Sequence, residues 1–194
     1  MPKRLFIGLE LPLNTRTMLA ALDPRIKGLR WLPVDQFHLT MSFLGQVEPA
    51  QEETLRAALA RVSVPPFFLP IQGVGAFGGE RPTIVWAGIG QGHPHLFALH
   101  KHLQDAVLAS GFEPDLRPFH PHITLARAKD VPRPALRPFL HRYEETEFDL
   151  LPVTGFVLLS SLLSHEGATH TVEMRREFRA GGRQSPPGTF LGMG

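Results

Sequence analysis

The chain has 194 residues, 43% of them hydrophobic, and a formal net charge of +2. A chain of this length and composition can bury a sizeable core, which excludes disorder over most of its length. The small charge argues against a protein that wraps long nucleic acid electrostatically. Cysteine is absent, which excludes disulfides and thiolate metal sites.

The N-terminal segment "MPKRLFIGLELPLN" has a basic start and a short apolar run, but Glu10 interrupts the run and no small-residue cleavage site follows. No other stretch approaches the roughly 20 apolar residues that a membrane span requires. We therefore expect a soluble, cytoplasmic protein that does not enter a membrane.

The first half of the chain alternates between strand and helix patterns. Asn14 is placed to cap one helix, and Pro49 suits the first turn of another. In chain order we expect a strand (4–12), a helix (14–26), a strand (37–45), a helix (48–62) and two strands (67–77 and 83–90).

The second half repeats this order. We expect a helix (93–110) with Gly111 as its C-terminal cap, a strand (119–129), a short helix (131–143) and two further strands (148–161 and 169–178). The repetition indicates a coarse internal duplication, and duplicated lobes tend to pack about a pseudo-two-fold axis. We predict an α+β fold in which residues 1–179 form one bilobal domain, each lobe having an antiparallel sheet and helices. The Gly/Pro/Ser-rich residues 180–194 are expected to be a disordered tail.

The segment "FHLTMSFLG" (37–45) carries polar residues on one face of a clean amphipathic strand. Its alternation places His38, Thr40 and Ser42 on one side and Phe37, Leu39, Met41 and Phe43 on the other. For one H-x-T taken alone, a solvent-exposed strand face is the simplest interpretation.

The same pattern returns 84 residues later in "FHPHITLARAK" (119–129), where His120, His122 and Thr124 share one face. A pseudo-two-fold axis would bring both H-x-T faces to one cleft between the sheets, with two imidazoles and two hydroxyls around a small volume.

Two such strands in a duplicated chain of this size resemble the 2H phosphoesterase superfamily, and within it the RNA 2',3'-cyclic phosphodiesterases, also called 2'-5' RNA ligases. The resemblance covers nearly the whole chain. It includes "RLFIGLELP", "RWLPVDQFHLTMSFLG", "RPTIVWAGIG", "RPFHPHITLARAK" and "LLSSLLSHEGATHTV".

The resemblance implies metal-independent hydrolysis of a terminal 2',3'-cyclic phosphate to a 2'-phosphomonoester, and the reverse, ATP-independent 2'-5' ligation. It assigns His38 as proton donor and His122 as proton acceptor, while Thr40 and Thr124 hydrogen-bond the phosphoryl oxygens. Arg127 stands where the family often carries arginine, although strict alternation would turn it to the far face unless a bulge intervenes. No metal and no cofactor are implied. The expected partners are RNA ends with a cyclic phosphate, tRNA fragments among them, and the expected state is a monomer.

Three alternatives remain open on sequence grounds. The chain could be another 2H-type cyclic nucleotide phosphodiesterase, a metal-dependent hydrolase that uses His120 and His122, or a non-catalytic RNA-end binder. Among the aromatic residues, Phe43 and Phe119 are interpreted as core and Trp31 is undecided. Six further histidines are interpreted as solvated surface residues: His93, His95, His100, His102, His165 and His170.

Overall fold

The computed structural model describes residues 1–90, 93–113, 117–164 and 167–178. The residues expected to form a tail, 180–194, and His165 lie outside the described residues. The strands are β1 (Lys3–Glu10), β2 (Leu29–Trp31), β3 (His38–Val47), β4 (Phe67–Phe77), β5 (Ile84–Ile89), β6 (His122–Ala128), β7 (Glu147–Val153), β8 (Gly155–Ser164) and β9 (Gly167–Glu177). The helices are α1 (Leu13–Ala20), the 3-10 turn η1 (Val34–Gln36), α2 (Pro49–Leu59), α3 (Pro94–Ala109) and α4 (Arg133–Arg142).

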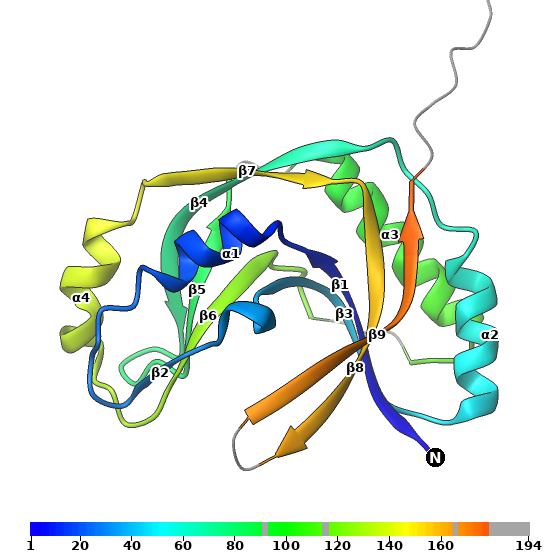
Figure 1. The fold of residues 1–194 in the computed structure, drawn as a ribbon, viewed down its shortest axis with the longest axis horizontal. Helices are drawn as coiled ribbons and strands as arrows, with labels where there is room; N and C mark the ends of the chain where they lie inside the picture. The colour runs from blue at the N-terminus through cyan, green and yellow to red at the C-terminus, as the bar shows by residue number, and fades with distance from the viewer. Residues whose placement is uncertain (91–92, 114–116, 165–166, 179–194) are drawn as a thin grey trace, which may run out of the picture.

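Across the described residues the strands form one strongly curved antiparallel sheet in the order β7-β4-β5-β6-β3-β1-β8-β9, with β2 added beside β6 (Figure 1). The sheet has two halves. Strands β3, β1, β8 and β9 make the β1 half-sheet, and strands β6, β5, β4 and β7 make the β4 half-sheet. The recorded register joins the halves at one residue pair, Leu39 with Ile123. The predicted α+β, two-lobed architecture is confirmed, and its two sheets are fused edge to edge.

The two lobes are not consecutive pieces of the chain. Strand β4 follows the first H-x-T strand in sequence but pairs with β5 and β7 in the other half-sheet. In exchange, β8 and β9 from the end of the chain extend the half-sheet that β1 begins. Each half-sheet therefore needs both halves of the sequence to be complete.

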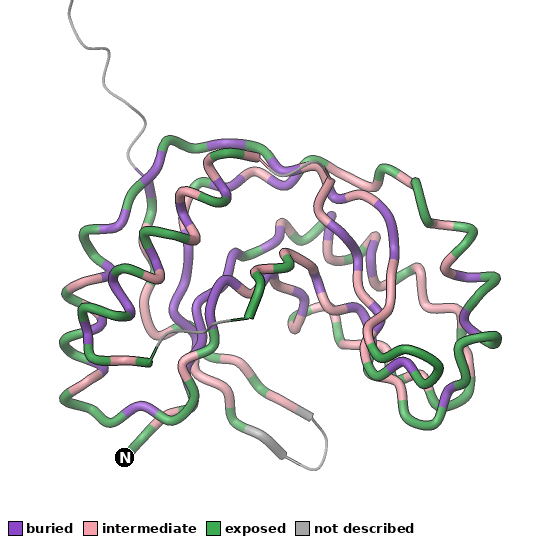
Figure 2. Tube along the Cα trace, turned by 180° about the vertical axis from the view of Figure 1, so that it is seen from behind, coloured by how far each residue is buried: buried purple, intermediate pink, exposed green. Residues whose placement is uncertain are grey.

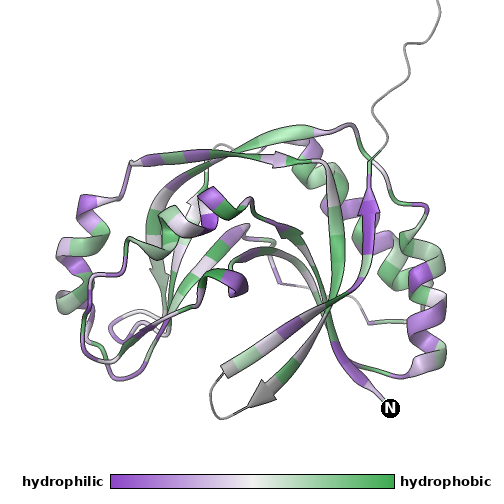
Figure 3. Ribbon diagram, in the orientation of Figure 1, coloured by the Kyte–Doolittle hydropathy of each residue, from purple (hydrophilic) through white to green (hydrophobic). Residues whose placement is uncertain are grey.

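Helices cover the apolar side of each half-sheet. Helix α3 packs on β3 and on α2, while α4 packs on β4. Helix α1 reaches the β4 half-sheet, where the Thr15 hydroxyl donates a hydrogen bond to the Asp149 carboxylate. Buried positions concentrate in the central strands and on the inner faces of the helices, and hydrophilic residues lie on the outer helix faces (Figures 2 and 3). No helix among the described residues is both long and apolar enough to span a membrane.

Several element boundaries differ from those predicted. Helix α1 ends at Ala20 instead of 26, and Pro12 is its N-cap, so Asn14 is not a capping residue. The expected strand 148–161 is divided at Thr154 into β7 and β8, which lie in different half-sheets. Two expectations are confirmed, since Pro49 opens α2 and Gly111 after α3 has a positive φ of 81°.

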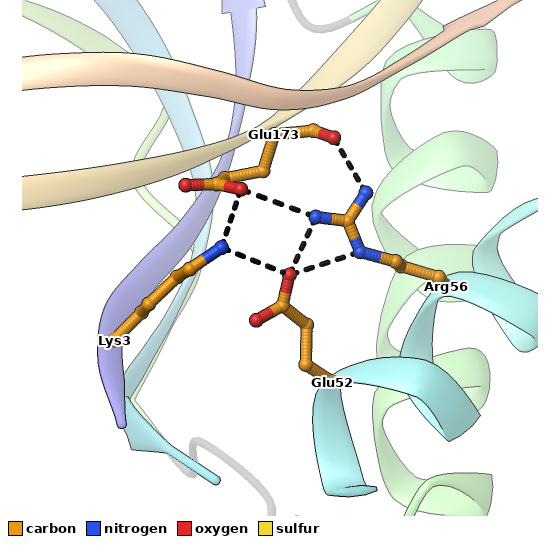
Figure 4. A network of polar contacts seen from close by, with 4 residues as sticks. All are labelled: Lys3, Glu52, Arg56 and Glu173. Carbon is orange, nitrogen blue, oxygen red and sulfur yellow. Dashed lines mark hydrogen bonds and ion pairs between the residues drawn. The ribbon is translucent and has the colours of Figure 1, made fainter. Parts of the chain in front are cut away.

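A network of ion pairs and hydrogen bonds between charged side chains connects α2 to the β1 half-sheet (Figure 4). Lys3 on β1 pairs with Glu173 on β9 at 2.6 Å and with Glu52 on α2 at 3.5 Å. Arg56, one turn after Glu52, contacts both carboxylates and also donates to the main-chain carbonyl of Glu173. Isolated exposed pairs contribute little, but here each charge meets more than one partner and Glu52 is buried.

Candidate active site

The junction between the two half-sheets brings the H-x-T motifs side by side. Leu39 and Ile123 pair there and are fully buried on the helix-covered face. Antiparallel pairing about this point places His38 next to Thr124 and Thr40 next to His122, all on the opposite face.

Two adjoining cavities open on this face, and we call them together the H-x-T cleft. The first has a volume of about 120 Å³ and is lined by His38, both threonines, Arg127 and other residues of β1, β8 and β9. The second, of about 220 Å³, is lined by Thr40, His122 and the segment that precedes β6. Thr40 borders both cavities, so they adjoin at this residue, with His38 in one lining and His122 in the other.

Both histidine rings are oriented in the same way by their own strands. The Nδ1 atom of His38 lies 2.8 Å from the main-chain oxygen of Gln36, and that of His122 lies 2.7 Å from the oxygen of His120. A carbonyl oxygen can only accept, so each Nδ1 carries the hydrogen and donates it. Each Nε2 is therefore left to exchange protons with a molecule in the cleft.

The surroundings favour the neutral form of these rings. Burial lowers the pKa of His38 to about 4, and repulsion from His170 adds to the effect. Burial also lowers the pKa of His122, against a smaller opposing contribution from its bond to His120. An imidazole in this cleft therefore takes up a proton less readily than one in water, unless an anion enters.

Matching bulges turn two further residues into the cleft. Thr40 pairs with Gly8 and Ser42 with Ile7, so Met41 is an extra residue in β3. Phe43 consequently points to the cleft side and is 60% exposed, and its interpretation as a core residue is wrong.

The bulge in β6 has the same position relative to its motif. Thr124 pairs with Trp86 and Ala126 with Val85, which makes Leu125 the extra residue. Arg127 then returns to the cleft side and lines the cavity that contains His38. Bulges of this kind commonly re-aim side chains beside active sites.

His170 was interpreted as solvated, but β9 carries it to the cleft. Its ring lies edge-on to His38 with 5.2 Å between centroids, and the ring of Phe6 contacts both histidines. Burial is the main cause of a lowered pKa for His170. The alternating sequence of β9 predicts which of its residues share a face. It does not predict that this face lies near His38, because that depends on β8 and β9 joining the β1 half-sheet.

The other aromatic and histidine candidates have clearer surroundings. Trp31 packs edge-on against Phe139 and donates from Nε1 to the main-chain oxygen of Leu19, so it is structural. Phe119 is half-buried and stacks on His100 at 3.8 Å, in the second cavity.

His120, the candidate metal ligand beside His122, is exposed in the segment that precedes β6. The centroids of the two rings lie 6.2 Å apart. Within the described ranges, no third His, Cys, Asp or Glu joins them in a group that could hold a metal ion.

Known proteins resemble this chain in both sequence and fold. The model of the 2'-5' RNA ligase superfamily matches residues 19–180. The chain belongs to this superfamily. The resemblance drawn from the two H-x-T motifs is thereby confirmed, and the family includes phosphodiesterases.

Two curated relatives, both named RNA 2',3'-cyclic phosphodiesterase, illustrate the likeness. One from Escherichia coli is 35% identical over 157 residues, which is 77% of this chain and 86% of that protein. One from Aeropyrum pernix is 32% identical over 135 residues, or 69% and 77% of the two chains.

Solved structures extend the likeness to nearly the whole fold. E. coli LigT complexed with 3'-AMP superposes with a TM-score of 0.76 at 29% identity, covering 92% of this chain and 99% of that one. The protein TT0787 of Thermus thermophilus gives a TM-score of 0.76 at 28% identity, over 91% and 98%.

Proposed function

We propose that this protein is an RNA 2',3'-cyclic phosphodiesterase that opens a terminal cyclic phosphate to a 2'-phosphomonoester without a metal ion. The observation that carries the proposal is the pairing at Leu39 and Ile123, which sets two carbonyl-oriented imidazoles and two hydroxyls around one cleft. The names of the curated relatives supply the substrate class.

The reaction requires one proton to be removed and one to be delivered. His122 Nε2 accepts a proton from water as the water oxygen bonds to phosphorus, and the P–O3' bond breaks. His38, protonated at Nε2, donates its proton to the departing O3' atom. The products are a 2'-phosphate and a 3'-hydroxyl, and the two histidines have exchanged protonation states.

The remaining polar residues act on the phosphoryl group. The hydroxyls of Thr40 and Thr124 donate to the non-bridging oxygens, where charge develops in the transition state. Arg127 supplies a guanidinium beside them, whose planar set of donors suits phosphate.

The lowered pKa values of both histidines make the protonation of His38 depend on the substrate. Burial lowers the pKa of His38 to about 4 and keeps its ring neutral in the free protein, so His38 acts as the donor only when the bound substrate favours its charged form. The negative phosphate of the substrate raises the pKa of both imidazoles when it binds. The pair is coupled, so its two apparent pKa values belong to both residues together.

The same site can also join two RNA ends. A 5'-hydroxyl of a second RNA in place of water would attack the cyclic phosphate in line and form a 2'-5' bond without ATP. RNA fragments with cyclic ends, including those of tRNA, are the proposed substrates for both reactions.

Incubation of the protein with a short RNA that ends in a 2',3'-cyclic phosphate tests the proposal directly. The product is identified by its mass and by whether enzymes specific for a 3'-phosphate act on it. We expect a 2'-phosphate product in the presence of a strong chelator. His38→Ala and His122→Ala should each lower kcat by ~10² to 10⁴ while leaving the fold intact by circular dichroism.

Other outcomes would contradict the proposal in distinct ways. Activity lost with the chelator, and lost equally in His120→Ala and His122→Ala, would favour a metal-dependent hydrolase. Binding without turnover would favour an RNA-end binder. Turnover of small cyclic nucleotides but of no RNA would favour another cyclic nucleotide phosphodiesterase.

A further inference from the structure

A large cavity lies outside the H-x-T cleft. It is a groove of about 760 Å³ between α4 and the β4–β5 hairpin. Helix α4 stands beside these strands at one end of the molecule (Figure 1). Its lining consists of Val74, Gly75, Ala76, Trp86, Arg133, Arg137, Pro138, Leu140, His141 and Glu144.

The groove exists because β4 loses a neighbour partway along its length. Strand β7 pairs with β4 from Phe67 to Gln72, and the recorded register ends there. From Val74 to Phe77 the described structure pairs β4 only with β5. The open edge faces α4, which packs on the core through Leu136 and Phe139 and leaves its other side to the groove.

The helix presents a line of basic side chains to this groove. Arg133, Arg137 and His141 are spaced four residues apart and therefore lie on one face of α4. Arg137 forms no ion pair or side-chain hydrogen bond with any described residue, while Arg133 donates to the carbonyl of Gly79. The one acidic lining residue, Glu144, lies 3.5 Å from His141 at the C-terminal end. The groove is thus positively charged along most of α4.

Trp86 connects the groove to the H-x-T cleft. Its indole lies across Gly75, where even a Cβ atom would come within 2.2 Å of the ring. On the side toward the cleft the indole contacts Phe77 and His120, at centroid distances of 5.3 Å for each. The ring of His122 is 6.4 Å away. A continuous aromatic surface therefore leads from the basic groove to His122.

We propose that this groove binds the RNA chain on the 5' side of the cyclic phosphate, with Arg133 and Arg137 contacting its phosphates. The proposal rests on the proposed function, because hydrolysis of a terminal cyclic phosphate leaves only one polynucleotide segment to be accommodated. An unpaired guanidinium and an adjoining aromatic surface suit single-stranded RNA, which offers phosphates and unstacked bases.

The test compares two substrates that differ only in this segment, a 2',3'-cyclic mononucleotide and an octanucleotide that ends in the same cyclic nucleotide. The double variant Arg133→Gln/Arg137→Gln should lower kcat/KM for the octanucleotide by about tenfold, mainly through KM, and leave that for the mononucleotide unchanged. Losing two phosphate contacts should also reduce the slope of log affinity against log salt by about 1.4.

A matched control removes the same charge from outside the groove. Arg61→Gln/Arg142→Gln removes two exposed arginines, one in the turn after α2 and one at the end of α4, and it should leave both substrates unaffected. Because Arg133 also bonds to the Gly79 turn, Arg137→Gln alone serves as a second variant. It should show about half of the effect on the logarithmic scale.

Equal losses for both substrates, or no loss for the octanucleotide, would overturn the groove proposal while the proposed function stands. If the wild-type protein opened neither substrate, the proposed function would fail instead. In that case, binding of a labelled octanucleotide measured by fluorescence anisotropy would still test the groove proposal. Equal affinity of the wild type and the double variant would refute that proposal.

Discussion

Replacing His38 by glutamine should change how the stability of the protein depends on pH. The folded protein holds the pKa of this imidazole at about 4, compared with 6.5 for an unperturbed histidine, chiefly because the ring is buried. The unfolded chain therefore binds a proton at His38 at a higher pH than the folded chain does. Stability associated with the neutral ring is fully present above pH 6.5 and is lost as the pH falls toward 4.

With these two pKa values, the contribution of His38 to the free energy of unfolding falls by about 2 kcal/mol between pH 7 and pH 5. Partial solvent access to the ring reduces the expected value to about 1–2 kcal/mol. Wild-type protein should lose this much more stability than His38→Gln over the interval, measured by urea denaturation at both pH values. His141→Gln, an exposed histidine on α4, controls for loss of an imidazole.

The same difference between wild type and His38→Gln at pH 7 and at pH 5 would refute the reasoning. It would mean that the fold does not hold His38 neutral, and the account of its substrate-dependent protonation would lose its basis.

Three further predictions concern catalysis. The profile of kcat/KM against pH should be bell-shaped with its maximum below pH 6.5, because the pKa values of both His38 and His122 are lowered in the free protein. A maximum above pH 8 would contradict this prediction. Thr40→Val and Thr124→Val should each lower kcat by about 10- to 100-fold, less than either histidine variant, and steady-state rates on a cyclic-ended RNA would show it. His170→Phe should raise the pKa of His38 and so shift to higher pH the limb of the profile that reports this residue, because it removes a repulsion that lowers this pKa, and two unmoved limbs would count against that coupling.

The periodic elements were largely predictable, because their signals are local. The alternation in 67–77 defines β4 at its observed bounds, and the apolar spacing in 93–110 gives α3 to within one residue at each end. The repeated H-x-T pattern marked the strands at the centre of the cleft, and the spacing of polar residues was enough to place His38 with Thr40 and His122 with Thr124.

What the sequence did not reveal depends on contacts between distant segments. Bulges at Met41 and Leu125 are set by the register against β1 and β5, so alternation alone misplaced Phe43 and made Arg127 conditional. The exchange of β4 with β8 and β9 between half-sheets leaves no local signal, and it is this exchange that brings His170 beside His38.

The most direct test of the central claim is single-turnover opening of a cyclic-ended RNA by paired histidine variants on two substrates of different leaving-group acidity. If His38 protonates the departing oxygen, a substrate with a better leaving group should restore much of the rate in His38→Asn and little of it in His122→Asn. Rescue confined to His122→Asn would exchange the two roles. Full wild-type rates in both variants would contradict the claim that these two imidazoles carry the proton transfers.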